Sequence, residues 1–106
     1  AVKAEYEALA KANENSWRIL FAIANVFSYN EYFKEAIPMW QKTFDCMPKP
    51  RYTDSFEAMA QCCVRMGDHE RAVEYYKKEL ELLREDWGLK YGAEVDALEE
   101  KIRALQ

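Results

Sequence analysis

The chain has 106 residues, half of them hydrophobic, a formal net charge of −4, and only three Gly and three Pro. This length predicts one domain, residues 1–106, and so few Gly and Pro leave little turn chemistry for a many-stranded sheet. Residues 1–66 carry eight acidic and eight basic residues, whereas residues 67–106 carry eleven and seven. The excess is acidic and no basic stripe is present, which argues against direct nucleic-acid binding.

The search for targeting signals and the cysteine pattern both bear on where the protein is located. No apolar run reaches the length of a membrane span, and no signal peptide is visible. The three cysteines, two of them adjacent, make no sensible disulfide framework. These features predict a cytoplasmic protein in a reduced setting, without membrane contact.

Apolar residues recur at helical spacings of three and four along most of the chain, which predicts about six helices. Asn30 is expected to cap the third, and Asp54 with Glu57 stands at capping-box spacing at the start of the fourth. Gly67-Asp68 suits the end of one helix and the start of the next. The prolines at 48 and 50 break any helix between the third and fourth. In chain order the expected helices are Val2–Ala12, Ser16–Ser28, Glu31–Met47, Asp54–Met66, His69–Asp86 and a last one carrying Val95, Leu98, Ile102 and Leu105.

Two copies of one pattern lie 36 residues apart, at about 16–48 and 52–87. Each copy holds two apolar stripes of helical period separated by a short polar break, which predicts antiparallel helical hairpins stacked side by side. The first helix precedes the two copies, and the last follows them as a capping helix. The paired positions are Leu20/Phe56, Ile23/Met59, Ala24/Ala60, Phe27/Cys63, Ala36/Ala72, Ile37/Val73, Trp40/Tyr76, Phe44/Leu80 and Met47/Leu83.

The second half of each copy resembles the tetratricopeptide repeat. An alanine sits where the two helices of a hairpin cross closely, and an aromatic residue four positions later fills the space beside it. Leu20 and Phe56 stand where that family usually has Trp, and Arg84 where it has Pro. The resemblance implies an all-α, right-handed superhelix of hairpins that binds protein or peptide. The residues that carry it are Ala36, Trp40, Thr43 and Pro48 in the first copy and Gly67, Ala72 and Tyr76 in the second.

The end of the chain, after an over-long helix that stops at Gly88, is similar to the bacterial transcriptional activator domain. That family is a tetratricopeptide-like module found beside a winged-helix DNA-binding domain. The resemblance covers roughly residues 31–106, but Tyr91 and Ala93 stand where the family has two prolines. The matching residues are Leu83, Glu85, Gly88, Glu94, Leu98 and Ile102.

No catalytic, metal or cofactor site is predicted. His69, the only histidine, is expected to be a half-buried residue at a helix start rather than a general base. The cysteines at 46, 62 and 63 have no metal-ligand spacing with it. With only three glycines, the chain holds no phosphate-binding loop.

A concave binding face is the better prediction. In such stacks the first helix of each hairpin lines the concave side, and eight of its residues here lie outside the core stripe. Asn25 and Gln61 are one 36-residue step apart, and their amides suit an extended peptide backbone. The equally weighted alternative is an ordinary polar surface. The eight residues are Arg18, Phe21, Asn25 and Tyr29 in the first copy and Asp54, Glu57, Gln61 and Arg65 in the second.

Trp17, Phe21, Tyr29 and Tyr32 also lie outside the core register of the first copy. They either pack between helices or form an apolar docking patch for a neighbouring domain or a second copy of the chain.

The sequence therefore favours a non-enzymatic interaction domain, specifically the regulatory or assembly module of a bacterial transcriptional regulator. Its expected partner is a protein or peptide, an adjacent DNA-binding domain, or a second copy. The alternative is a free-standing tetratricopeptide adaptor or peptide sensor. A winged-helix domain encoded immediately upstream would decide for the regulator.

Overall fold

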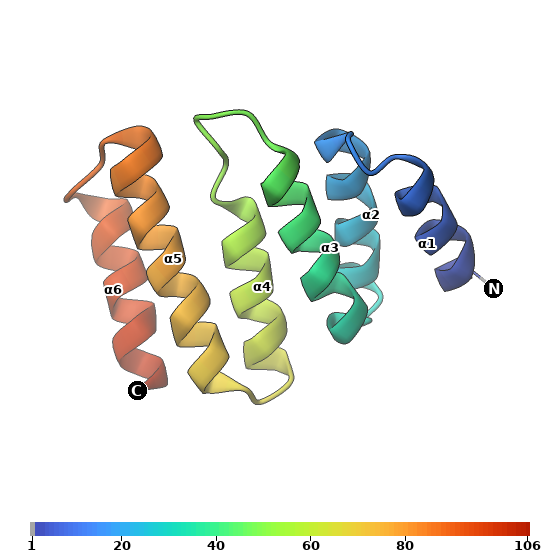
Figure 1. Cartoon of the computed structure of the whole chain (residues 1–106). Helices are drawn as coiled ribbons and strands as arrows, with labels where there is room; N and C mark the ends of the chain where they lie inside the picture. The colour runs from blue at the N-terminus through green and yellow to red at the C-terminus, as the bar shows by residue number, and fades with distance from the viewer. Residues whose placement is uncertain (1) are drawn as a thin grey trace.

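A computed structural model describes residues 2–106, which form six helices and no strand. The helices are α1 (Val2–Ala12), α2 (Trp17–Tyr29), α3 (Phe33–Cys46), α4 (Asp54–Arg65), α5 (His69–Trp87) and α6 (Ala93–Leu105). They lie side by side in chain order, each running opposite to the one before it (Figure 1). None of these helices is long and apolar enough to cross a membrane.

The connections alternate between the two ends of the stack (Figure 1). The α2–α3 and α4–α5 connections are tight turns at one end and close the two hairpins. The α1–α2, α3–α4 and α5–α6 connections lie together at the opposite end, which we call the upper end. The start of α2, the start of α4 and the end of α5 therefore lie at this same end of the stack (Figure 1).

Local sequence accounts for several helix ends. Ser16 caps α2 by accepting from the backbone N–H of Ile19, and Asp68 caps α5 by accepting from that of Arg71. Gly67 and Gly88 both have positive φ, +80° and +66°, which glycine adopts without the steric penalty of a Cβ. After Gly88 the N–H of Leu89 bonds to the carbonyl of Leu83, so the left-handed residue ends α5 as predicted.

Two predicted caps are wrong. Asn30 ends α2 instead of starting α3, because its side-chain amide donates to the carbonyl of Val26. The capping box at Asp54 and Glu57 does not form: Asp54 is already helical, and Thr53 precedes it without a side-chain cap. The charge of Asp54 still lies at a helix N-terminus, where an acidic side chain is favourable.

The core follows the 36-residue repeat. Ala36 and Ala72 are fully buried, and Trp40 and Tyr76 are 2% and 5% exposed. The Trp40 indole N–H donates to Ser28 Oγ at 2.8 Å, which satisfies its polar atom inside the first hairpin. At the C-terminal end, α6 packs on α5 through three buried side chains, Val95, Leu98 and Ile102.

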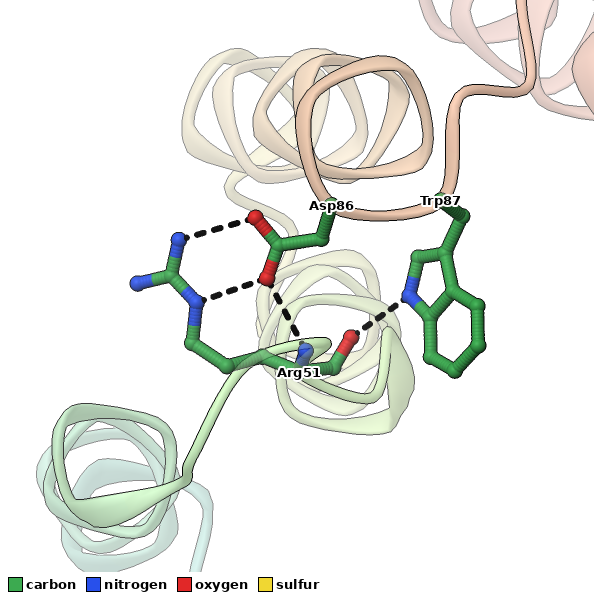
Figure 2. Close-up of polar contacts among 3 residues, drawn as sticks. All are labelled: Arg51, Asp86 and Trp87. Carbon is green, nitrogen blue, oxygen red and sulfur yellow. Dashed lines mark hydrogen bonds and ion pairs between the residues drawn. The ribbon is translucent and has the colours of Figure 1, made fainter.

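The two hairpins are also joined at the upper end by a polar clamp (Figure 2). Asp86, near the end of α5, accepts from the backbone N–H of Arg51 at 2.9 Å and from both Nε (2.9 Å) and Nη2 (3.2 Å) of its guanidinium. Trp87 Nε1 donates to the Arg51 carbonyl at 2.7 Å. The α3–α4 connection contains prolines and cannot pair its backbone N–H and C=O groups as a helix would. The hydrogen bonds to Asp86 and from Trp87 satisfy some of these groups and hold the connection against α5.

The clamp predicts a loss of stability in acid. Hydrogen bonds from Arg51 hold the pKa of Asp86 at about 2, below its ordinary value of 3.8. The folded protein is therefore stabilised above pH 3.8, and this contribution disappears as the pH falls to about 2. We expect Asp86→Asn to lower the free energy of unfolding at neutral pH and to reduce its decline in that acid window, measured by urea denaturation. The exposed neighbour supplies the control, Glu85→Gln; equal behaviour of the two variants would contradict this role.

Candidate functional site

A groove lies between α4 and α6. Within residues 2–106, α6 packs against α5, while its backbone does not approach that of α4. Two cavities occupy the space, one of about 330 Å³ and one of about 310 Å³. They share Thr53, Leu83 and Glu94 in their linings and so form one continuous depression, which we call the α4–α6 groove.

The larger cavity is acidic. Its floor is Glu79 of α5, which is only 5% exposed and whose Oε1 has no hydrogen-bond partner. Glu57 of α4 and Glu94 of α6 line its sides. Lys101 of α6 lies across it, with Nζ 3.4 Å from Glu57 Oε1 and 5.6 Å from the centre of the Tyr76 ring.

Burial dominates the chemistry of Glu79. Desolvation disfavours the charged carboxylate and, with repulsion from Glu57, raises its pKa from 4.5 to about 8. Lys101 opposes this shift, while Asp54 and Glu94 add to it. Glu79 therefore carries a proton in most molecules at neutral pH, in contrast to an ordinary surface glutamate.

The smaller cavity is aromatic and lies towards the upper end of the stack. Tyr52 and Trp87 line it and remain 48% and 46% exposed. Their rings stack with centroids 6.3 Å apart, and Trp17 lies 5.8 Å from Tyr52 on the other side. An aromatic row, Trp17–Tyr52–Trp87, therefore runs across the upper end over α2, the α3–α4 connection and α5.

Two of the four predicted binding residues of the second copy line this groove. Glu57 lines the acidic cavity and Asp54 the aromatic one. Gln61 lies one turn further along α4 and donates to Glu57 Oε1 at 3.5 Å. Arg65, at the far end of α4, pairs instead with Glu31 and stacks over the Phe33 ring.

The predicted binding residues of the first copy do not gather around one cavity. Arg18 and Asn25 are exposed on α2, with the Arg18 guanidinium 5.2 Å from the Trp17 ring. Phe21 is half-buried, because its ring packs edge-on against Trp40 at 5.1 Å. Tyr29 is 90% exposed at the last residue of α2.

The four aromatic residues near α2 do not form a single patch. Trp17 and Phe21 pack together at the first turns of α2, with ring centroids 6.4 Å apart. Tyr29 lies twelve residues beyond Trp17, which is about 18 Å along a helix axis. Tyr32 packs edge-on against the buried Phe27 but remains 42% exposed.

Sequence reasoning missed Glu79, although the repeat contained a signal for it. The small residue seven positions after Ala36 is Thr43, which is fully buried and donates to the Met39 carbonyl. The corresponding position after Ala72 is Glu79. Lys101 was missed because no repeat register relates α6 to the preceding hairpins.

The histidine and the cysteines singled out in the sequence lie in different surroundings. His69 is exposed at the start of α5, so the expected half-buried placement is wrong. Burial raises the pKa of the Cys62 and Cys63 thiols, which lowers the fraction of each that is present as the nucleophilic thiolate. The described residues contain no group of three metal-ligating side chains.

The geometry defines an all-α stack of antiparallel helical hairpins, the predicted fold class. The family model of the tetratricopeptide repeat matches residues 55–86, within the second predicted copy. The solution structure of protein BPP2914 from Bordetella parapertussis is similar, with a TM-score of 0.69 over 99% of this chain and 87% of that chain. The two sequences are 18% identical, so this likeness concerns the fold. No curated protein matches the chain. A tetratricopeptide-like stack of this kind suggests a protein-interaction module.

The buried carboxyl predicts an unusual pH dependence. Because the folded-state pKa of Glu79 lies above its ordinary value, the folded protein binds a proton more tightly than the unfolded chain. Stability should therefore fall as the pH rises from 4.5 to about 8. Glu79→Gln keeps the shape but cannot ionise, so this variant should lose the decline and be more stable than the parent at pH 8, measured by urea denaturation. Glu81→Gln, on an exposed position of the same helix, should keep the decline; the same slope in all three proteins would refute the assignment.

Proposed function

We propose that this chain is a non-catalytic protein-interaction module that binds an extended segment of a partner polypeptide in the α4–α6 groove. The observation that carries the proposal is the continuity of two cavities of different chemistry, one aromatic and one acidic, on a tetratricopeptide-like hairpin stack. Two of the predicted α4 residues, Asp54 and Glu57, line this groove. Tetratricopeptide adaptors are the class that it fits best.

A polypeptide suits the groove for physical reasons. Exposed Tyr and Trp side chains are enriched in protein interfaces, because they bury large apolar areas and keep a polar atom for hydrogen bonding. Tyr52 and Trp87 are half exposed yet held in place by stacking and by the hydrogen bond from Trp87 to Arg51. A surface that is already ordered loses little side-chain entropy when it binds.

A second candidate is the regulatory or assembly module of a bacterial transcriptional regulator. The feature that favours it is the C-terminal end, where α5 runs on to a left-handed Gly88 and α6 folds back on it. This arrangement is what the resemblance of residues 31–106 to the activator domain implies. In that case the partner is an adjacent DNA-binding domain or a second copy of the chain, and residues 1–106 act as one cytoplasmic unit. A winged-helix domain encoded immediately upstream would favour this regulator over a free-standing adaptor.

Selection from a phage-displayed library of random peptides tests the groove. We expect selected peptides to bind the parent protein and to lose about tenfold or more in affinity when Ala97→Trp fills the acidic cavity, measured by fluorescence anisotropy. Ala97 is exposed and lines that cavity, so the variant should fold. The control is Ala104→Trp, at an exposed position of the same helix outside both cavities. Recovery of no peptide that distinguishes the two variants would reject the groove as the binding surface.

A further inference from the structure

The acidic cavity differs from its counterpart in the first hairpin at three positions one repeat apart. In the first hairpin Phe21 packs edge-on against Trp40, and the neighbouring Thr43 is fully buried. The corresponding residues in the second hairpin are Glu57, Tyr76 and Glu79. The same place in the fold is filled by aromatic packing in one copy and opened into a carboxylate-lined cavity in the other.

Glu79 is the unusual member of this set. A carboxyl group that is 95% removed from solvent ordinarily has hydrogen-bond partners for its oxygens, since burying an unpaired polar atom costs about 1–3 kcal/mol. Its Oε1 has no partner in the protein, although the side chain lines a cavity of about 330 Å³. The contacts within the protein therefore leave the burial of this carboxyl group uncompensated, at a position that lines the cavity.

The surroundings define the charge of that ligand. Three carboxylates, those of Asp54, Glu57 and Glu94, act on Glu79 in this space, against the single ammonium of Lys101. Lys101 is already engaged by Glu57 and by the Tyr76 ring. The remaining negative potential favours a second cation, and the described residues offer no cluster of three ligands for a metal ion.

We propose that the acidic cavity receives the side chain of a lysine or arginine from the bound polypeptide, with Glu79 as the carboxylate that anchors it. This inference rests on the proposed function, because it specifies the chemistry of what the groove receives. The adjoining aromatic cavity then takes an apolar side chain next to the basic one. The module selects segments in which basic and apolar residues alternate, and it discriminates against acidic ones.

Protonation of Glu79 couples to this binding. Its pKa of about 8 keeps the Glu79 carboxyl largely protonated at pH 7 while the cavity is empty, and an arriving ammonium favours the ionised form. The cation therefore displaces one proton, and affinity rises as the pH approaches 8. Asp54 and Glu57 from α4, and Glu94 and Lys101 from α6, are the other charged groups that act on this equilibrium.

A small probe tests the anchor directly. n-Butylammonium chloride carries the end of a lysine side chain, and carbon-13 NMR follows the titration of each glutamate carboxyl. We expect the probe to lower the midpoint of the Glu79 titration by on the order of one pH unit, relative to the same concentration of sodium chloride. The exposed Glu81 carboxyl should respond equally to both salts. An unchanged Glu79 midpoint would overturn the proposal.

The library-selected peptides supply the second test. Replacing the basic residue of a selected peptide with Gln should weaken its binding to the parent protein and to the Glu81→Gln control by about tenfold, and should have little effect on binding to Glu79→Gln. Groove-binding peptides that need no basic residue would overturn this inference and leave the proposed function intact. Failure to obtain any groove-binding peptide would contradict both this inference and the proposed function.

Discussion

The structure depends on the close crossing of two helices within each hairpin. A hairpin cannot bury both of its apolar stripes alone, so each one gains its core by stacking on the next. Ala36 and Ala72, the small residues of the repeat pattern, have no exposed surface, and the aromatic residues four positions later, Trp40 and Tyr76, are buried as well. The Arg51–Asp86 clamp adds a polar tie at the upper end, where a proline-containing connection has no helical hydrogen bonds of its own.

That repeated geometry is also what makes the groove possible. Two equivalent positions have the same backbone but different side chains, so the repeat offers two sites for different uses. Phe21 packs against Trp40 and Thr43 is buried in the first hairpin, while Glu57 and Glu79 line the acidic cavity in the second. The buried carboxyl opposes folding at neutral pH, because the carboxylate that is ionised in the unfolded chain takes up a proton when it is buried. A feature that destabilises the free protein is characteristic of a functional site.

Chemistry in the groove changes along its length. Tyr52 and Trp87 give the upper end a large, ordered apolar surface, and Glu79, Glu57 and Glu94 give the adjoining part a negative potential. The aromatic part supplies binding energy that any apolar residue can use, whereas the acidic part selects for charge. A partner in which basic and apolar side chains alternate engages both. The net charge of −4, with its acidic excess after residue 66, suits the same partner.

The sequence by itself determined the hairpins. Helical periodicity, the break at Gly67-Asp68, the stop at Gly88 and the 36-residue repeat are properties of the sequence alone. Each boundary of the first five helices lies within about two residues of its expected place. Only the tertiary structure decided which side chains meet. Asp86 lies 35 residues from Arg51 and Lys101 lies 44 residues from Glu57, and both pairings depend on how the helices stack. The burial of Glu79 has the same origin. Its place in α5 follows from the helical period, but its burial and its unpaired oxygen depend on how the neighbouring helices pack around it.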